Sequence, residues 1–326
     1  MVEIKKIGLL TSGGDAPGMN AAIRAVVKAG IHFDVGVMGI FKGYHGLIHN
    51  LMKPLDAQSV NHILPLGGTI LKSARSPEFR TPEGRKIAYE NFKANGLDGL
   101  IVIGGDGTFT GADLFEGEFN VPVIGLPGTI DNDLYGTDYT IGYDTAVNTV
   151  MDAVDKLRDT AYSHDRLFIV EVMGRDAGFI ALRGGIACGA QKILIPESRT
   201  YVEDLLSTLE KGMGSGDNSA IVIVAEGSEF GGAMEVQKIV NERFPDYDTR
   251  VSILGHIQRG GSPSAFDRIL ASGMGFQAVK GIVEGCRGVM VGSVSRQIVF
   301  TPFAQSIKHH KTFNMELKNI AEILSA

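Results

Sequence analysis

Short apolar runs alternate along the whole chain with segments in which apolar positions recur at helical spacing. Apolar runs of this length, bounded by glycine, proline or asparagine, are typical of buried strands. We therefore expect strands in the segments 4–10, 34–41, 97–103, 121–126, 167–173, 192–195, 220–225 and 250–254, with short strands near Val289 and Ile298.

Helical spacing follows most of these runs, and one helix has signals at both ends. Thr81 and Pro82 mark its start, and Asn95 and Gly96 mark its end. The expected helices are 19–29, 55–64, 81–95, 144–161, 177–188, 201–213, 265–284 and 314–325. Strands that alternate with helices in this way predict an α/β fold with parallel sheets covered by helices on both faces.

The composition limits the class of protein. The chain has 326 residues, enough for one large domain or two medium ones, and 44% of them are hydrophobic. A net charge of −6 and the lack of a basic run argue against a nucleic-acid partner. The apolar runs are too short to span a membrane, and we expect no signal peptide. Cys188 and Cys286 are the only cysteines, which fits a reducing cytoplasm.

The stretch 127–133 holds two carboxylates two residues apart, Asp131 and Asp133, directly after the expected strand 121–126. Two carboxylates in a partly dry crevice raise each other's pKa or require a cation. This arrangement suits a base beside a metal-bound phosphate. An ordinary acidic turn gives the same pattern, so the stretch alone leaves both interpretations open.

Six expected strands end in glycine-rich or charged loops, which begin at Thr11, Gly104, Pro127, Gly174, Glu226 and Gly255. In open α/β sheets, ligands bind outside the carboxyl ends of the strands. Because parallel strands bring these ends to one edge of a sheet, we expect the loops to line one or two facing clefts.

Two of these loops favour phosphate, because their glycines expose backbone N–H groups where a helix begins. They hold Gly13 and Gly14 in the first loop and residues 104–107 in the second. Neither loop is a Walker A motif or a dinucleotide fingerprint. Asp106 is a natural ligand for the magnesium of a nucleotide. A tight strand-to-helix turn capped by Asp106 is the alternative interpretation of the second loop.

Cationic residues lie close to the expected strand ends and suit an anionic substrate: Arg166, Arg175, Arg250, His256 and Arg259. Arg75 adds a phosphate-binding candidate in the irregular segment 67–76, and Glu226 is a candidate acceptor for sugar hydroxyls. Taken singly, each arginine is expected to be a solvated surface charge.

With these residues assembled, the chain resembles the bacterial ATP-dependent 6-phosphofructokinases from Ile4 to about Gly292. The motifs that carry the resemblance are the segments 11–20, 104–108, 127–133, 173–175 and 255–261. The segment 104–108 is shared with kinases of NAD and of lipids, so it is weak evidence by itself.

The resemblance implies transfer of the γ-phosphoryl group of Mg-ATP to the 1-hydroxyl of fructose 6-phosphate. It implies two doubly wound α/β domains with mostly parallel sheets and an active site in the cleft between them. The ATP-binding domain is expected at 1–142 and 258–308, and the fructose 6-phosphate domain at 143–257 and 309–326. It also implies a cytoplasmic homotetramer.

The resemblance also assigns roles to individual residues. Asp131 is the general base, Asp133 supports it, and Asp106 holds magnesium. The expected nucleotide residues are Gly14, Arg75, Ser76, Gly105, Asp106, Gly107 and Thr108. The expected sugar phosphate residues are Thr129, Ile130, Asp131, Met173, Gly174, Glu226, His256, Ile257, Gln258 and Arg259. Arg175 steadies the transferring group, and Thr129 and Gly14 are further expected catalytic residues. Arg166 and Arg250 reach the sugar phosphate of a neighbouring subunit.

Two further groups of positions bear on the phosphoryl donor and on regulation. Family members that use pyrophosphate carry an acidic residue at the position of Gly107 and a lysine at that of Gly128, so the glycines here favour ATP.

The positions that match the effector site are Arg24, Lys28, Arg158, Gly189, Gln191, Ser215 and Asp217. Basic residues are missing at Ser215, Asp217 and Asn218, and Gln191 replaces an acidic residue, so we expect weakened effector control.

Two other functions remain open from the sequence. A kinase of NAD or of a lipid would use residues 104–108 but would have no use for Arg166, Arg250 and His256. A nucleotide sensor without catalytic activity would tolerate loss of Asp131.

Overall fold

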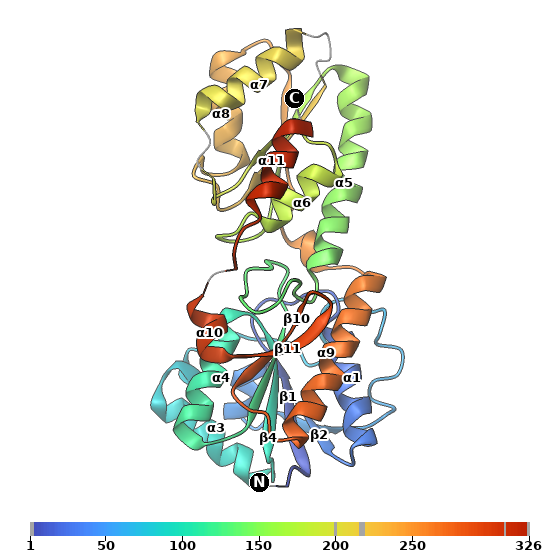
Figure 1. Cartoon of the computed structure of the whole chain (residues 1–326), viewed down its shortest axis with the longest axis vertical. Helices are drawn as coiled ribbons and strands as arrows, with labels where there is room; N and C mark the ends of the chain where they lie inside the picture. The colour runs from blue at the N-terminus through green and yellow to red at the C-terminus, as the bar shows by residue number, and fades with distance from the viewer. Residues whose placement is uncertain (1–2, 199–200, 215–218, 310, 325–326) are drawn as a thin grey trace. The chain divides into compact units, whose positions relative to one another are not determined.

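The structure is a computed structural model that describes residues 3–198, 201–214, 219–309 and 311–324 (Figure 1). The chain divides into two compact units. Unit 1 consists of Met1–Ile130, Leu134–Thr145 and Arg259–Lys311, and unit 2 of Asp131–Asp133, Ala146–Gln258 and Thr312–Ala326. The short stretch that contains Asp131 therefore leaves unit 1 and returns to it.

Unit 1 is built on a seven-stranded sheet with the strand order β11-β10-β5-β4-β1-β2-β3. Its strands are β1 (Lys6–Thr11), β2 (Gly36–Ile40), β3 (Met52–Leu55), β4 (Gly99–Gly104), β5 (Val123–Pro127), β10 (Val289–Val294) and β11 (Gln297–Pro302). The inner pairs are parallel, and the edge strands β3 and β11 are antiparallel to their neighbours. The strands β2 and β4 lie on opposite sides of β1, so the strand order reverses at β1.

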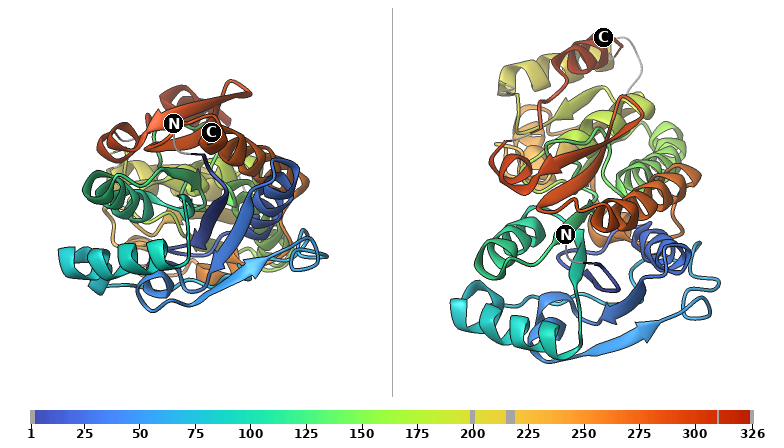
Figure 2. Two further views of the ribbon diagram at one scale, coloured as in Figure 1. Left: turned by 90° about the horizontal axis from the view of Figure 1, so that it is seen from below. Right: turned by 60° about the horizontal axis from the view of Figure 1, so that its bottom comes forward.

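Helices cover both faces of this sheet (Figure 1; Figure 2 shows the same layers from below). The helices α1 (Met19–His32) and α9 (Ala265–Val283) pack together on one face, and α3 (Pro82–Ala94) and α4 (Asp106–Phe119) lie on the other. The shorter helices are α2 (Gly43–Ile48), η1 (Glu78–Arg80) and α10 (Phe303–Lys308). An aromatic core that includes Phe92, Phe109 and Phe115 fills the space between α3, α4 and the sheet.

Unit 2 is built on a four-stranded parallel sheet with the order β7-β8-β6-β9. Its strands are β6 (Leu167–Val172), β7 (Lys192–Leu194), β8 (Ala220–Ala225) and β9 (Thr249–Ile253). Its helices are α5 (Tyr143–His164), which begins in unit 1, α6 (Phe179–Ala187), α7 (Val202–Gly214), α8 (Ala233–Arg243), η2 (Gly255–Arg259) and α11 (Met315–Leu324). The helices α7 and α8 share one hydrophobic core with β6 and β8, and α6 packs against α11.

These two sheets confirm the predicted α/β fold with mostly parallel strands. The predicted helix at 55–64 is wrong: the segment after β3 is a series of turns. Ser59 donates both its backbone N–H and its hydroxyl to Asp56 Oδ1, at 2.8 and 2.6 Å. Such local side-chain bonds compete with the helical pattern, and they lower the pKa of Asp56. Among the described helices, none combines the length and apolar character that crossing a bilayer requires.

Candidate active site

The carboxyl ends of β1 and β4 lie side by side where the strand order of unit 1 reverses. The backbone N–H of Ser12 donates to Ile103 O at 2.9 Å and joins the two loops that follow these strands. Ligands of doubly wound sheets bind at such a switch point. The two glycine loops predicted to bind phosphate therefore lie at the expected place in the fold.

The loop after β4 leads directly into α4, with Gly105 as the N-cap residue. The N–H groups of Thr108 and Phe109 both donate to Gly105 O, at 3.0 and 3.1 Å. A Cβ atom at Gly104 would lie only 2.5 Å from Ser12 O, so the neighbouring loop requires glycine there. Asp106 is exposed at the first position of the helix, which places a carboxylate at the positive end of a helix dipole.

Arg75 and Ser76 belong to a segment that is tied to the β1 loop. Thr11 Oγ1 donates to Lys72 O at 3.0 Å, and Ser73 Oγ donates to Gly13 O at 2.7 Å. Arg75 is exposed, and Ser76 Oγ is buried without a hydrogen-bond partner among the described residues. A buried hydroxyl of this kind is costly unless a ligand or water satisfies it.

Arg259 lies over the backbone of Gly14. A Cβ atom at Gly14 would be 2.5 Å from the Arg259 Nη1 atom and 2.9 Å from its Cζ atom. Both residues belong to unit 1, so the guanidinium adds positive charge to the first glycine loop. A larger residue at position 14 would require the Arg259 guanidinium to move, so glycine keeps the guanidinium close to this loop.

The stretch after β5 begins beside the same loops. Gly128 N donates to Gly104 O at 3.0 Å, and Thr140 Oγ1 donates to Thr129 O at 2.6 Å. A Cβ atom at Gly105 would lie 3.8 Å from Thr129 Cβ, so Thr129 lines the second glycine loop. Ile130 is buried, with 2% of its surface exposed.

Asp131 is a buried carboxylate beside a cation. Its residue is 5% exposed, and its Oδ2 atom lies 4.0 Å from Arg175 Nε. Asn132 follows it with a φ of 55°, a left-handed conformation that asparagine tolerates, and Asp133 is partly exposed. A charge that is this deeply buried requires a partner or a function.

The turn after β6 is held by two side chains of unit 2. Arg175 has a φ of 55°, which is strained for arginine, and its N–H donates to Glu226 Oε1 at 2.7 Å. Gly174 N donates to the same oxygen at 3.2 Å, and Met173 N donates to Gln258 Oε1 at 2.9 Å. One oxygen of Glu226 is therefore committed to this turn rather than to a sugar hydroxyl.

Gln258 is fully buried within η2, and its Nε2 atom has no partner among the described residues. His256 and Ile257 are exposed on the same short helix, after a left-handed Gly255 with a φ of 52°. The predicted residues of unit 2 from β6, β8 and η2 therefore lie at the carboxyl end of its sheet.

Arg166 and Arg250 lie at the opposite, amino end of that sheet. Arg166 immediately precedes β6, and Arg250 pairs with Phe168 near the start of β9. The strand β6 has 6 residues and spans roughly 20 Å between these ends. Arg166 and Arg250 therefore do not lie beside the turn at Gly174.

A single carboxylate, Asp248, holds both arginines. Arg166 Nε lies 2.6 Å from its Oδ2 atom, and Arg250 Nη2 lies 2.9 Å from its Oδ1 atom. The hydrogen bond from Arg166 lowers the pKa of Asp248. Sequence reasoning missed Asp248, for which the only signal is an acidic residue two positions before Arg250.

A family model covers most of this chain. The family model described as phosphofructokinase matches residues 6–282. This chain belongs to the phosphofructokinase family. The resemblance seen in the sequence is thereby confirmed.

Named relatives match over their whole length. ATP-dependent 6-phosphofructokinase 2 of Bacteroides thetaiotaomicron is 57% identical over 325 residues, which cover 100% of both chains. ATP-dependent 6-phosphofructokinase of Cytophaga hutchinsonii is 51% identical over 322 residues, which cover 99% of this chain and 98% of the relative. The structure of phosphofructokinase from Saccharomyces cerevisiae superposes with a TM-score of 0.89 at 38% identity, over 98% of this chain and 46% of the yeast chain.

The glycines that bear on the donor of a phosphofructokinase have different surroundings. A Cβ atom at Gly107 would meet no atom within 4 Å, so the space beside it is open as expected. At Gly128, a Cβ atom would lie 2.8 Å from Ile103 Cγ2 and 3.0 Å from Met19 Cε, so no room is open there. Of these two glycines, only Gly107 has open space beside it.

The effector positions are only partly described. Arg158 donates to Cys188 O and to Gly189 O, and Gln191 Oε1 accepts a bond of 2.7 Å from Ile221 N. Arg24 and Lys28 are partly exposed on α1 in unit 1. Ser215, Asp217 and Asn218 lie outside the described residues.

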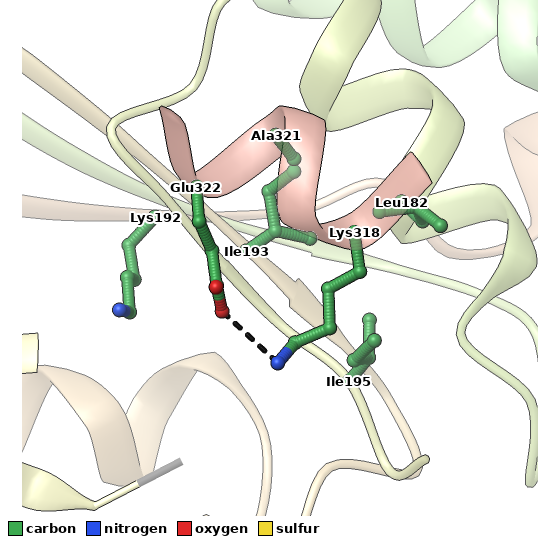
Figure 3. A pocket seen from close by; sticks show the side chains of 7 residues that line it. All are labelled: Leu182, Lys192, Ile193, Ile195, Lys318, Ala321 and Glu322. Carbon is green, nitrogen blue, oxygen red and sulfur yellow. Dashed lines mark ion pairs between the residues drawn. The ribbon is translucent and has the colours of Figure 1, made fainter. Parts of the chain in front are cut away.

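A small pocket in unit 2 lies apart from the predicted residues (Figure 3). It lies between α6, β7 and α11, and an ion pair of 2.9 Å between Lys318 and Glu322 borders it. Its lining residues are Leu182, Lys192, Ile193, Ile195, Lys318, Ala321 and Glu322. We assign it no part in catalysis, because none of the predicted catalytic or binding residues lines it.

Proposed function

We propose that this chain phosphorylates fructose 6-phosphate at its 1-hydroxyl with ATP, to give fructose 1,6-bisphosphate and ADP. The observation that carries the proposal is the buried Asp131 carboxylate beside the Arg175 guanidinium. A buried carboxylate at the end of the motif 127–133 suits a general base, and a neighbouring cation suits the negative charge of a transferring phosphoryl group.

In this proposal Asp131 accepts the proton of the 1-hydroxyl as its oxygen attacks the γ-phosphorus, and ADP leaves with the bond electrons. Asp133 supports Asp131 electrostatically, and Arg175 and Thr129 position the transferring group. The exposed start of α4 and the glycine loop at Gly14 bind the phosphates of ATP through backbone N–H groups.

The donor set at the nucleotide loops fits a magnesium ion. Asp106 is an exposed carboxylate at the start of α4, and a hard oxygen ligand of this kind, with phosphate oxygens, is what Mg²⁺ prefers. Asp106 would hold the ion directly or through water. The ion would supply charge neutralisation between the β- and γ-phosphates.

Unit 1 is proposed to bind ATP through Gly14, Arg75, Ser76 and residues 105–108. Met173, Gly174, Glu226, residues 256–258 and Arg259 are proposed to bind the sugar phosphate. Arg166 and Arg250 are proposed to act on a neighbouring subunit of a cytoplasmic homotetramer. Their place at the amino end of the sheet supports a role in a different copy of the site.

The test is a coupled assay of ADP release with fructose 6-phosphate as acceptor. ATP is compared with pyrophosphate as donor, and NAD and a diacylglycerol are compared as acceptors. We expect turnover only with ATP and fructose 6-phosphate. Comparable turnover with pyrophosphate, NAD or the lipid would replace the proposed function with another.

A further inference from the structure

Two histidines and a glutamate of unit 1 form a cluster away from the residues proposed for catalysis. His45 lies on α2, His49 follows one turn later at the end of that helix, and Glu78 begins η1. The ligand atoms of the three side chains lie within 4.8 Å of one another. Two histidines four positions apart share one side of a helix, so both imidazoles point toward Glu78.

We propose that His45, His49 and Glu78 form a binding site for a divalent transition-metal ion such as Zn²⁺. Two imidazoles and one carboxylate are a ligand set that Zn²⁺ accepts, with a fourth position left for water. Mg²⁺ prefers oxygen ligands, so this site is distinct in chemistry from one at Asp106.

Only small movements of the three side chains are needed for them to bind one metal ion. Ligands of a tetrahedral Zn²⁺ lie roughly 3.4 Å apart, given metal–ligand distances of about 2.1 Å. His49 Nε2 and Glu78 Oε2 are already 3.0 Å apart. Their side chains are 44% and 58% exposed, so rotation about their side-chain bonds brings the ligand atoms together without disturbing the core.

An ion pair between His49 and Glu78 does not account for His45. The ring centroids of His45 and His49 are 4.1 Å apart, so the second imidazole lies beside the first. The nitrogen atoms of His45 add a third ligand position to the pair of His49 and Glu78.

The metal would join two elements that already share an aromatic contact. Tyr44 stacks on Phe79 with ring centroids 3.9 Å apart, and its hydroxyl donates to Thr108 O at 2.6 Å. Tyr44 directly precedes His45, and Phe79 directly follows Glu78. A metal that bridges α2 and η1 would therefore stiffen the support beneath the first turn of α4.

The test uses the full chain, stripped of metal by chelation and free of nucleotide. Calorimetric titration with Zn²⁺, and the visible absorbance of bound Co²⁺, measure binding without reference to enzymatic activity. We expect one saturable site per chain and a higher melting temperature in the presence of Zn²⁺. Each of the variants H45Q, H49Q and E78Q should weaken Zn²⁺ binding roughly tenfold or more.

A matched control is H62N, because His62 is an exposed histidine of unit 1 and its left-handed backbone tolerates asparagine. This control should bind Zn²⁺ like the parent chain. The proposal is overturned if the parent chain shows no saturable binding, or if H45Q binds Zn²⁺ as tightly as the parent. Melting temperatures measured without metal separate loss of binding from loss of folding. The result does not depend on the proposed kinase activity.

Discussion

The Nε atom of Arg175 lies 4.0 Å from the Oδ2 atom of Asp131, so an exposed cation and a buried carboxylate form a pair without a short hydrogen bond between these atoms. The backbone of Arg175 is strained, and Glu226 stabilises it through the N–H group of the same residue. The guanidinium is thus placed by a fixed turn, while its side chain is 58% exposed and able to adjust to an anionic ligand.

Replacement of Asp131 tests the base directly. We expect D131S to lower kcat by a factor of about 10² to 10⁴, because general bases contribute about that much. Binding of ATP should persist, since the nucleotide loops belong to unit 1. Steady-state kinetics and ATP titration give both quantities. Unchanged turnover in D131S would remove Asp131 from the base role.

Substitution of Gly107 tests the donor. The G107D variant places a second carboxylate beside Asp106 in open space, where it repels the phosphates of ATP. We expect the KM for ATP to rise about tenfold or more, with the melting temperature maintained. The control is G107A, which adds only a methyl group and should keep the parent KM. Equal KM values for G107D and the parent would place the nucleotide phosphates elsewhere.

Asp248 is expected to act as a positioning residue for Arg166 and Arg250. In D248N the amide offers one acceptor in place of two, so the arginines lose part of their shared support. The KM for fructose 6-phosphate should rise several-fold while kcat stays near the parent value. The variant D246N makes the same charge change two positions earlier and should behave like the parent. A fall in kcat alone would contradict a positioning role.

The effector positions predict weak control by anions. Phosphoenolpyruvate and Mg-ADP should change the activity of the parent chain only slightly, because Gln191 replaces an acidic residue. In Q191E, a carboxylate oxygen can still accept the hydrogen bond from Ile221 N, and the added charge should strengthen the response to Mg-ADP. Steep inhibition of the parent by modest concentrations of phosphoenolpyruvate would count against this view.

Asp267 gives a prediction for stability against pH. It is fully buried, it accepts bonds from Gly142 N, Thr145 N and Thr145 Oγ1 at 2.9, 2.8 and 2.5 Å, and burial raises its pKa to about 6. A raised carboxyl pKa means that the folded chain binds the proton more tightly than the unfolded chain. The contribution of Asp267 to the stability of the folded chain is therefore greatest below about pH 4 and is lost as the pH rises through about 6.

The matched comparison is D267N, which cannot titrate. The difference in unfolding free energy between the parent and D267N should fall by about 2 kcal/mol from pH 4 to pH 7. Thermal melting of both proteins across this range measures the difference while the titration of all other groups cancels. A constant difference would show that Asp267 has an ordinary pKa.

Much of the fold is readable from the sequence because the buried strands are continuous apolar runs that end at glycine, at proline or before a charged residue. The strands β4, β5 and β8 are buried at every position, and each matches a predicted run closely. The helices α4 and α8 were not predicted as segments, since glycines in α4 and a low apolar content in α8 weaken their patterns.

The site was less completely predictable, because its contacts join residues far apart in the chain. Asp131 and Arg175 meet from separate segments, and the bonds of Thr11 and Ser73 to distant backbone oxygens have no local signal. The ion pair between Arg166 and Asp248 likewise joins two segments that lie far apart in the chain.

The sheet of unit 2 has the pair Arg166 and Arg250 at its amino end and the turn at Gly174 at its carboxyl end. In a closed ring of identical copies, each copy could complete a neighbour's sugar site while its own is completed in return. A variant that dissociates into single chains should then keep its affinity for ATP and lose its affinity for the sugar phosphate. Quaternary structure would in that case set substrate affinity, without any change in the residues that perform the chemistry.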